Sequence, residues 1–265
     1  MGLEGTSCKA GQVKFGTGYN SISPLEKKTM EVVAAVHFAT GAPIHSHTEA
    51  GTMGLEQIEL LKAVGVSLEN VSFGHMDRNM DLWYHRRIAD TGAYLCFDGI
   101  GKTKYHTESS LITHILTLVK EGYEDQILIS GDMARKSYYR HYQFGLGLGY
   151  VFDWFQIQFK EMAEKSGLEG EKLFYKFFYE NPQRCMTFKQ KKQDRIRRDF
   201  MKQIIYALED DYGMHARPAS RLAEVSQNYR SSMEIKYKEK TGDLKSMISV
   251  LKLGIKKGEA FHIEI

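Results

Sequence analysis

The sequence predicts two domains of different class: part of a parallel (β/α) barrel, and a smaller α+β domain after it. Residues 1–188 alternate short apolar runs with amphipathic segments of helix length, the pattern typical of βαβ units on a parallel sheet. Residues 189–200 are rich in Lys and Arg and have no apolar period, which indicates a linker. Residues 201–265 contain segments that alternate apolar and polar positions, as antiparallel strands with one solvated face do.

The first domain is expected to hold about five βα units of a TIM (β/α) barrel, a fold that closes with eight. Pro24 follows Ser23 in a helix-opening position, and Gly41 stands where that helix is expected to end. An open sheet leaves two unpaired edges, which favour a partner such as a second copy in a homodimer. The predicted strands are residues 12–16, 42–47, 71–75, 94–98 and 127–130, and the predicted helices are residues 24–40, 54–64, 81–91, 108–121 and 148–165.

The second domain is expected to be a small α+β sandwich with one open sheet face. Its alternating segments predict antiparallel strands at residues 203–208, 233–238 and 260–265. Helices are predicted at residues 218–229 and 246–253.

The composition is that of a globular protein and excludes several classes. Apolar residues make up 42% and charged residues 26% of the chain, ordinary values for a folded protein. A formal charge of +3 is too small to indicate a nucleic-acid partner, and the basic run is better explained as a solvated linker. Cys8, Cys96 and Cys185 form neither a disulfide framework nor a zinc-finger pattern, which fits the reducing cytoplasm. The sequence predicts neither a signal peptide nor membrane insertion.

Four residues suited to a metal site follow the apolar runs of the first domain: Lys14, His47, His75 and Asp132. Polar side chains at the carboxyl ends of successive strands build the active sites of (β/α) barrels. His nitrogen and Asp oxygen are good zinc ligands, whereas lysine has no acceptor atom and could bridge metals only as a carbamate. Each residue alone is best explained as structural, and it is their order that indicates a site. His45 shares a face with His47 but lies one layer deeper, so we do not expect it to be a ligand.

Motifs around these residues resemble the phosphotriesterase-related branch of the amidohydrolase superfamily. The resemblance covers about residues 3–188 and is greatest for members described as lactonases with weak phosphotriesterase activity. It implies a metal-dependent hydrolase that acts on a lactone, an ester or a phosphotriester. The motifs are residues 9–14 (KAGQVK), 41–48 (GAPIHSHT), 51–57 (GTMGLEQ), 74–77 (GHMD), 130–132 (SGD) and 180–184 (ENPQR).

The resemblance implies a role for each of the four residues. Lys14 would be the carboxylated bridge between two divalent metals, and His47 and His75 would bind the second metal. Asp132 would bind the first metal and act as the catalytic residue that accepts the proton of the attacking hydroxide. Zinc is the first expectation, with manganese, cobalt and iron as alternatives.

The resemblance also implies a substrate border and two further ligands. Tyr105 and the loop of residues 135–149 would border the substrate. The family takes two more metal ligands from a His-x-His motif on its first strand, which has no counterpart in this sequence. A catalytically inert half barrel and a truncated gene product therefore stay open beside a working hydrolase.

The second domain contains a histidine, His215, directly before a predicted helix that Pro218 opens. The free backbone N–H groups and the dipole of a helix start favour an anion. Imidazole is a capable nucleophile toward phosphoryl groups, and Arg217 could pair with phosphate oxygens. For an isolated histidine, capping of the helix is the simpler explanation.

The sequence around His215 resembles HPr, the histidine phosphocarrier of the sugar phosphotransferase system. The motifs are residues 213–219 (GMHARPA), 244–248 (LKSMI) and 253–258 (LGIKKG). The resemblance implies that His215 takes phosphate from Enzyme I and passes it to an Enzyme IIA, with Arg217 stabilising the phosphohistidine. Ser246 falls where a regulatory HPr kinase acts on related proteins, although a serine at a helix start is also an ordinary N-cap. HPr continues into a third helix, which would cover one side of the sheet and is not found in this sequence.

Two functional hypotheses follow for the chain as a whole. In the first, a metal-hydrolase module is fused to a phosphocarrier in one cytoplasmic protein. In the second, only the phosphocarrier acts.

Overall fold

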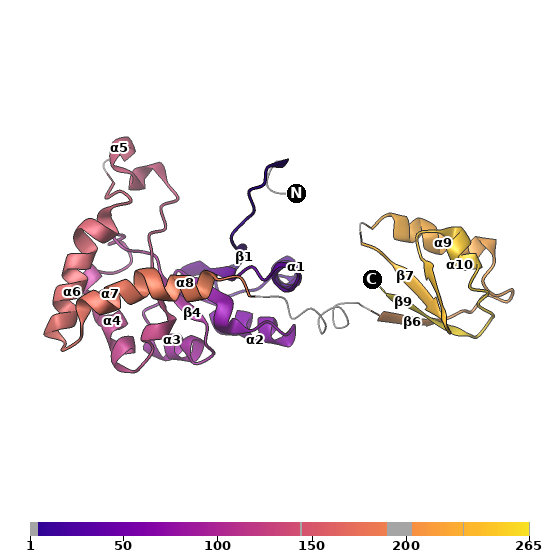
Figure 1. Ribbon diagram of the computed structural model, residues 1–265, viewed down its shortest axis with the longest axis horizontal. Coiled ribbons are helices and arrows are strands. Elements are labelled where there is room, and N and C mark those ends of the chain that lie inside the picture. Colours follow the sequence, from indigo (N-terminus) through magenta and orange to yellow (C-terminus); the bar gives the residue numbers. More distant parts are fainter. Residues whose placement is uncertain (1–4, 144, 190–202, 230, 265) are drawn as a thin grey trace. The chain divides into compact units, whose positions relative to one another are not determined.

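The computed structural model describes residues 5–143, 145–189, 203–229 and 231–264. It divides the chain into two compact units, residues 1–191 and 192–265 (Figure 1). The predicted linker, residues 189–200, lies outside the described residues except for Lys189. In the described part of the chain, no helix is long and apolar enough to cross a membrane.

The first unit contains a five-stranded sheet in which every pair of neighbouring strands is parallel, in the order β1-β2-β3-β4-β5. Sequential order with parallel pairing is the arrangement of a (β/α) barrel, so the predicted partial barrel is confirmed. Helices α1 to α4 contact one another in turn along the sheet (Figure 1). The strands are Val13–Thr17, Ile44–Thr48, Val71–Gly74, Tyr94–Phe97 and Ile127–Ile129, and the helices are Pro24–Thr40, Gly54–Ala63, Leu82–Ala89 and Glu108–Lys120.

Helix α1 begins and ends where the sequence predicts. Ser23 and Glu26 form a reciprocal capping box, with Pro24 at the first helical positions. Gly41 ends the helix in the left-handed region, with a φ of 76°, which glycine adopts without steric cost. The helix therefore returns the chain to the start of β2.

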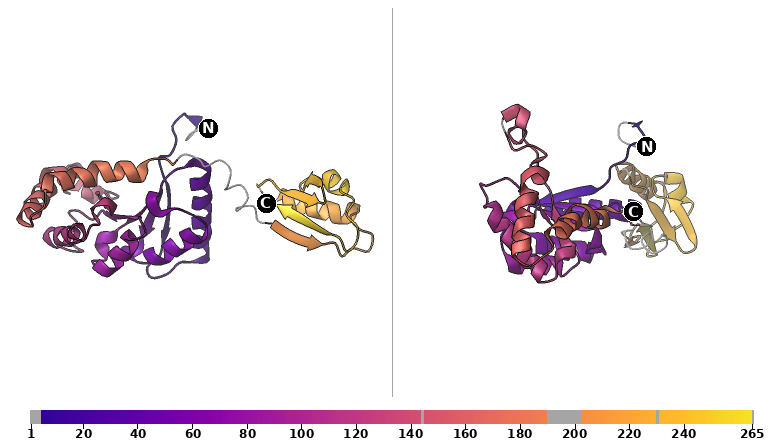
Figure 2. Two further views of the ribbon diagram at one scale, coloured as in Figure 1. Left: turned by 60° about the horizontal axis from the view of Figure 1, so that its bottom comes forward. Right: turned by 60° about the vertical axis from the view of Figure 1, so that its left-hand side comes forward.

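The segment after β5 differs from the prediction. The predicted helix at 148–165 opens with a π-helical stretch, Val151–Phe155, before α6 (Gln156–Lys165). Three further helical segments were not predicted: α7 (Gly170–Tyr175), a π-helical stretch (Lys176–Glu180) and α8 (Asn181–Met186). They form one helical run, orange in Figure 2, that adds Phe174 and Phe177 to the core. The short helix α5 (Arg140–Gln143) projects from the body of this unit in Figure 1 and in the right-hand view of Figure 2.

Helix α8 holds the opposite end of the sheet from the predicted metal site. Asn181 is fully buried, and its Nδ2 donates to the carbonyls of Glu124 and Ile127, just before and at the start of β5. Asn70, before β3, donates to the carbonyls of Cys185 and Thr187. The 180–184 motif therefore has a structural role at the amino ends of the strands.

The second unit is an antiparallel sheet with strand order β6-β9-β7-β8, and α9 and α10 lie on one face of it (Figure 1). The predicted small α+β domain is confirmed. Strand β8, Lys240–Asp243, was not predicted, because its residues (KTGD) lack apolar alternation. The other elements are β6 (Gln203–Ala207), α9 (Ala216–Gln227), β7 (Glu234–Tyr237), α10 (Met247–Leu251) and β9 (Ala260–Glu264).

Candidate metal centre and candidate phosphorylation site

The register of the sheet determines how the predicted metal residues face one another. Strand β2 alternates burial, with Ile44, Ser46 and Thr48 buried and the two histidines between them half-buried. His45 and His47 therefore share a face, as predicted. Lys14 pairs in register with His45, and Gly16 pairs with His47. Lys14 thus lies level with the deeper histidine.

His47 and His75 meet at the carboxyl ends of β2 and β3. His75 Nε2 lies 2.8 Å from His47 Nδ1, and the two rings stand nearly perpendicular. The outer nitrogen of each ring contacts a carboxylate: His47 Nε2 lies 3.0 Å from Glu49 Oε2, and His75 Nδ1 lies 2.7 Å from Asp98 Oδ1. Metal-binding histidines in proteins are held by carboxylates in this way. At 2.8 Å one inner nitrogen donates a hydrogen bond to the other, so a cation would take the place of that shared proton as the rings move apart by about half an ångström.

His75 is held in place by its own backbone conformation and by the end of the neighbouring strand. Strand β3 ends at Gly74, and His75 has a φ of 64° in the left-handed region, which is uncommon for residues other than glycine. Asp98 receives both the backbone N–H of His75 (3.0 Å) and its ring nitrogen. Asp77, fully buried, accepts from the backbone N–H groups of Asp98 and Gly99. The ends of β3 and β4 are thus joined through two carboxylates.

Asp132 lies after β5 and is held by cations. Its Oδ2 accepts from Lys102 Nζ at 2.7 Å and from Arg78 at 3.3 Å. Partial burial opposes ionisation of Asp132, but the hydrogen bond and charge of Lys102, with the charges of His75 and Arg78, outweigh it and lower its pKa. Among the described residues, no three His, Cys, Asp or Glu side chains come together as a metal-binding group. The structure thus brings His47 and His75 together and pairs Asp132 with Lys102.

His45 contacts the neighbouring strand β3. Its Nδ1 lies 2.8 Å from Ser72 Oγ. Burial, followed by the charges of Lys14, His75 and His47, lowers the pKa of His45 to about 4. A methyl group at Gly74 would lie 3.0 Å from the His45 ring, so the glycine leaves room for this imidazole.

Sequence reasoning missed Asp98, Glu49 and Lys102 as site residues. Asp98 directly follows β4, so the strand-end rule that selected His47 and Asp132 would also have found it. Glu49 directly follows β2, at the start of a one-turn 3-10 helix, so the same rule would have found it too. Lys102 lies in a loop, and only the folded chain brings it to the site.

A cavity of about 350 Å³ lies beside Asp132, between residues 100–104 and the loop after β5. Lys102, Lys104 and Arg135 line it together with Tyr138. The loop at 135–149 therefore supplies cavity residues, and Tyr105 lies nearby, its ring contacted by Lys104 Nζ at 4.5 Å from the centroid. Lys102 is paired with Asp132, so Lys104 and Arg135 are the two cations of this cavity that suit an anionic group.

The second candidate site is built on the first helix of the second unit. His215 is the N-cap of α9, and its Nδ1 accepts the backbone N–H of Arg217 at 3.4 Å. Its Nε2 lies 3.1 Å from Asp210 Oδ1. The His215 imidazole lies at the start of α9 and remains 38% exposed, so a reacting partner can reach it from solvent. Asp210 was not predicted as a site residue.

Ser246 caps the second helix of this unit. Its Oγ accepts the backbone N–H of Ser249 at 3.3 Å, so it is the N-cap of α10. The ordinary capping role that the sequence left open is thus present in the fold.

Histidines and carboxylates at the carboxyl ends of parallel strands place the first unit in the class of (β/α)-barrel modules, which build their sites at that end of the sheet. The model described as the phosphotriesterase family matches residues 1–186, and the model described as the PTS HPr component phosphorylation site matches residues 203–265. The chain therefore belongs to the phosphotriesterase family, with an HPr-like domain fused after the barrel module. Members of this family are metal-dependent hydrolases, and the HPr-like domain indicates phosphotransfer partners.

Individual relatives agree with this assignment. A "Phospho-furanose lactonase" of Mycoplasmopsis synoviae is 36% identical over 71% of this chain and 53% of its own length. The "Phosphotriesterase homology protein" of Escherichia coli is 36% identical over 63% of this chain and 56% of its own. A lactonase structure from Listeria monocytogenes is 60% identical with a TM-score of 0.70, over 71% of this chain and 57% of its own. The chain spans about half the length of these curated relatives.

Proposed function

We propose that the barrel module hydrolyses a lactone that carries a phosphate group. The observation that carries this proposal is the cavity beside Asp132, which Lys104 and Arg135 line. The name of the Mycoplasmopsis synoviae relative supports the same substrate class. Lys104 and Arg135 would hold the phosphate, while the lactone carbonyl would lie toward His47 and His75.

Residues of this chain supply the rest of the chemistry. His47 and His75 would hold a divalent metal, zinc first, with Lys14 as the carboxylated bridge to a second ion. When bound, such a metal polarises a carbonyl oxygen and acidifies water near neutral pH. Asp98 orients the His75 ring. Asp132, kept ionised by Lys102, would accept the proton of the attacking water.

The experiment is a hydrolysis assay on the full chain, supplied with zinc or manganese. It compares a five-carbon sugar lactone phosphate with the same lactone lacking the phosphate. Replacing Lys104 or Arg135 by Met is expected to raise KM for the phosphorylated lactone about tenfold, the size of one lost charge-assisted contact. Lys172→Met, an exposed change on α7, is the control. Absence of turnover on every lactone and ester tested would favour the second hypothesis, in which only the phosphocarrier acts.

We further propose that His215 of the HPr-like domain carries a phosphoryl group. The carrying observation is the Nδ1 lone pair, which faces the N-terminus of α9 and lies next to Arg217. Enzyme I and an Enzyme IIA of the phosphotransferase system are the proposed donor and acceptor, and the cytoplasm is the proposed location. Incubation with Enzyme I and phosphoenolpyruvate is expected to label the full chain but not His215→Ala, and an unlabelled wild type would refute the carrier role.

Ser246 is the proposed target of an HPr kinase. Mass spectrometry after incubation with the kinase is expected to locate one phosphate on Ser246, and Ser249 is the internal control because it lies on the same helix.

A homodimer that forms through the open edges of the first sheet is the proposed oligomer, and light scattering of the full chain would measure its mass.

A further inference from the structure

The carboxylate of Asp210 is built into a turn that directs it at His215. The backbone carbonyl of Asp210 accepts the N–H of Gly213 at 3.0 Å, and its Oδ1 accepts the N–H of Tyr212 at 3.0 Å. Gly213 has a φ of 72°, a conformation that favours glycine. Met214 N–H donates to the Ile255 carbonyl at 2.8 Å. The turn is thereby fixed both within itself and to the next loop.

The hydrogen bonds around His215 assign its two ring nitrogens. Nδ1 accepts a backbone N–H from Arg217, and a nitrogen that accepts carries no proton. In the neutral ring the proton therefore sits on Nε2, which faces Asp210 Oδ1 at 3.1 Å. The Tyr212 N–H and then His215 lower the pKa of Asp210, so this carboxylate is ionised at neutral pH.

The other charged groups around the ring leave this pairing intact. The charge of Arg217 also favours the ionised form of Asp210. Asp211, the next residue, pairs with Lys257. The Tyr212 ring lies 6.2 Å from the imidazole, centroid to centroid. Among the described residues, Asp210 is thus the carboxylate paired with His215.

We propose that Asp210 is a positioning residue for phosphoryl transfer at His215, holding the Nε2 proton and balancing the charge that the ring gains. This inference rests on the carrier role proposed above. The Nδ1 lone pair forms the bond to phosphorus as the bond from phosphorus to the donor's leaving group breaks, and its electron pair departs with that group. The ring keeps its Nε2 proton and becomes positive, opposite the Asp210 carboxylate. In the reverse step the electron pair of the N–P bond returns to Nδ1. An aspartate that faces the far nitrogen of a reacting histidine acts in the same way in hydrolase triads.

The test uses phosphoramidate, a small donor that phosphorylates histidine without Enzyme I, on the full chain. Asp210→Asn keeps an acceptor oxygen but removes the charge, and Asp210→Ala removes both. Asp211→Asn is the matched control, since it makes the same charge change one residue away. We expect the labelling rate to fall about two- to fivefold in Asp210→Asn, the range for a partly exposed charge pair. It is expected to fall further in Asp210→Ala and to be unchanged in Asp211→Asn.

A second readout follows the ring itself. Nitrogen-15 NMR of His215 is expected to show a changed Nε2 signal in Asp210→Ala. A full labelling rate in Asp210→Asn, an equal loss in Asp211→Asn, or an unchanged Nε2 signal in Asp210→Ala would each overturn the proposal. If the wild type takes no label from phosphoramidate, the carrier role itself fails. The NMR comparison then still decides whether Asp210 holds the ring.

Discussion

Nε2 of His75 lies 2.8 Å from Nδ1 of His47, and each ring is held from behind by a carboxylate. The two inner nitrogens converge on one point, where one donates a hydrogen bond to the other, and a cation would replace that shared proton. The carboxylates fix which nitrogen faces inward. The contact between the two rings is therefore stronger evidence for a metal site than the position of either histidine at the end of its strand.

The first prediction concerns metal binding. The full chain is expected to bind at least one zinc ion, and replacing His47 and His75 together by Ala is expected to abolish it. Asp98→Asn is expected to weaken affinity about 10- to 100-fold, as loss of an outer carboxylate does in metal sites. His45→Gln, on the same strand face but bound to Ser72, is expected to keep the metal. Calorimetry measures the zinc affinity and metal analysis the zinc content of each variant. A zinc content in the double variant equal to that of the wild type would contradict the site.

The second prediction concerns the packing of Asp77 under Gly99. A methyl group at Gly99 would lie 2.0 Å from Asp77 Oδ2, closer than two atoms can approach. Gly99→Ala is therefore expected to destabilise the first unit by about 1–3 kcal/mol. A methyl group at Gly11 would meet nothing within 4 Å, so Gly11→Ala is the control. Thermal unfolding compares the two, and equal melting temperatures would show that the loop adapts.

The strand-and-helix order could be predicted because apolar periodicity is a local property. The order of the strands in the first sheet then followed, since parallel βα units pair in sequence order. The sequence could not predict β8, where Lys240–Asp243 lacks apolar alternation and gains its structure from pairing with β7. It also could not predict the π-helical stretch at Val151–Phe155, because a single π-helical turn is too short to change the apolar period of the helix that contains it.

The sequence could predict which residues belong to the candidate sites, but not the contacts that those residues make. His47 and His75 were found from strand ends, whereas the left-handed conformation of His75 depends on Asp98 in the next strand. Asp132 was found in the same way, but its bond to Lys102 comes from a loop that no periodicity describes. Asp210 faces His215 only because Gly213 turns the chain.

The third prediction concerns Asn181 at the amino ends of the strands. Its Nδ2 serves two carbonyls at once, so Asn181→Ala leaves both without this donor. Burial of unpaired carbonyls is expected to cost about 2–3 kcal/mol. Asn228→Ala, whose amide makes an exposed 3.3 Å bond within its own helix, is expected to be nearly neutral. Denaturant unfolding of the full chain measures the stability of both variants. An equal loss of stability in the two would show that Asn181 does not hold the amino ends of the strands.

The fourth prediction concerns pH and the buried pair His85 and His114. His85 Nδ1 lies 2.7 Å from His114 Nε2 between α3 and α4. Burial, with the charge of His114, lowers the pKa of His85 to about 3, and burial lowers that of His114 to about 4. The fold therefore prefers both rings neutral, while the unfolded chain takes up protons below pH 6.5. This contribution to stability is fully present above pH 6.5 and is lost as pH falls toward 4 and 3.

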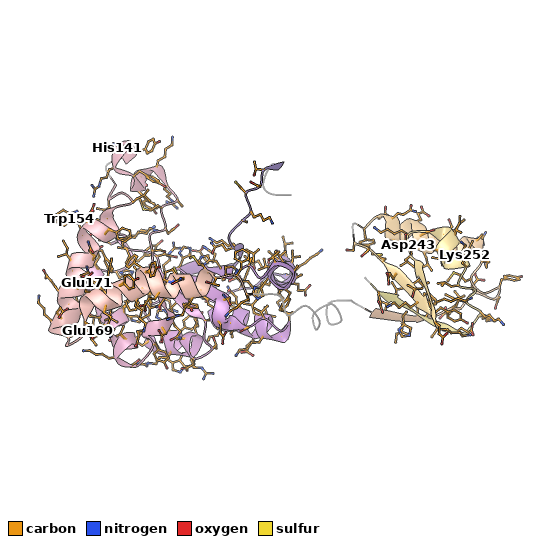
Figure 3. The ribbon with its side chains drawn as sticks, viewed as in Figure 1. His141, Trp154, Glu169, Glu171, Asp243 and Lys252 are labelled. Carbon is orange, nitrogen blue, oxygen red and sulfur yellow. The ribbon has the colours of Figure 1, made fainter. Side chains whose placement is uncertain are left out.

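The measurement is the unfolding free energy of the first unit between pH 7 and pH 4. His85→Gln keeps a hydrogen-bonding side chain that cannot take up a proton, so its profile is expected to be flatter than that of the wild type. His141, exposed on α5 (Figure 3), provides the matched control, because His141→Gln removes a histidine that packs against nothing in the core. A His85→Gln profile as steep as that of His141→Gln would assign the acid sensitivity to other groups. A flatter profile would show that burial of this pair makes the half barrel sensitive to acid.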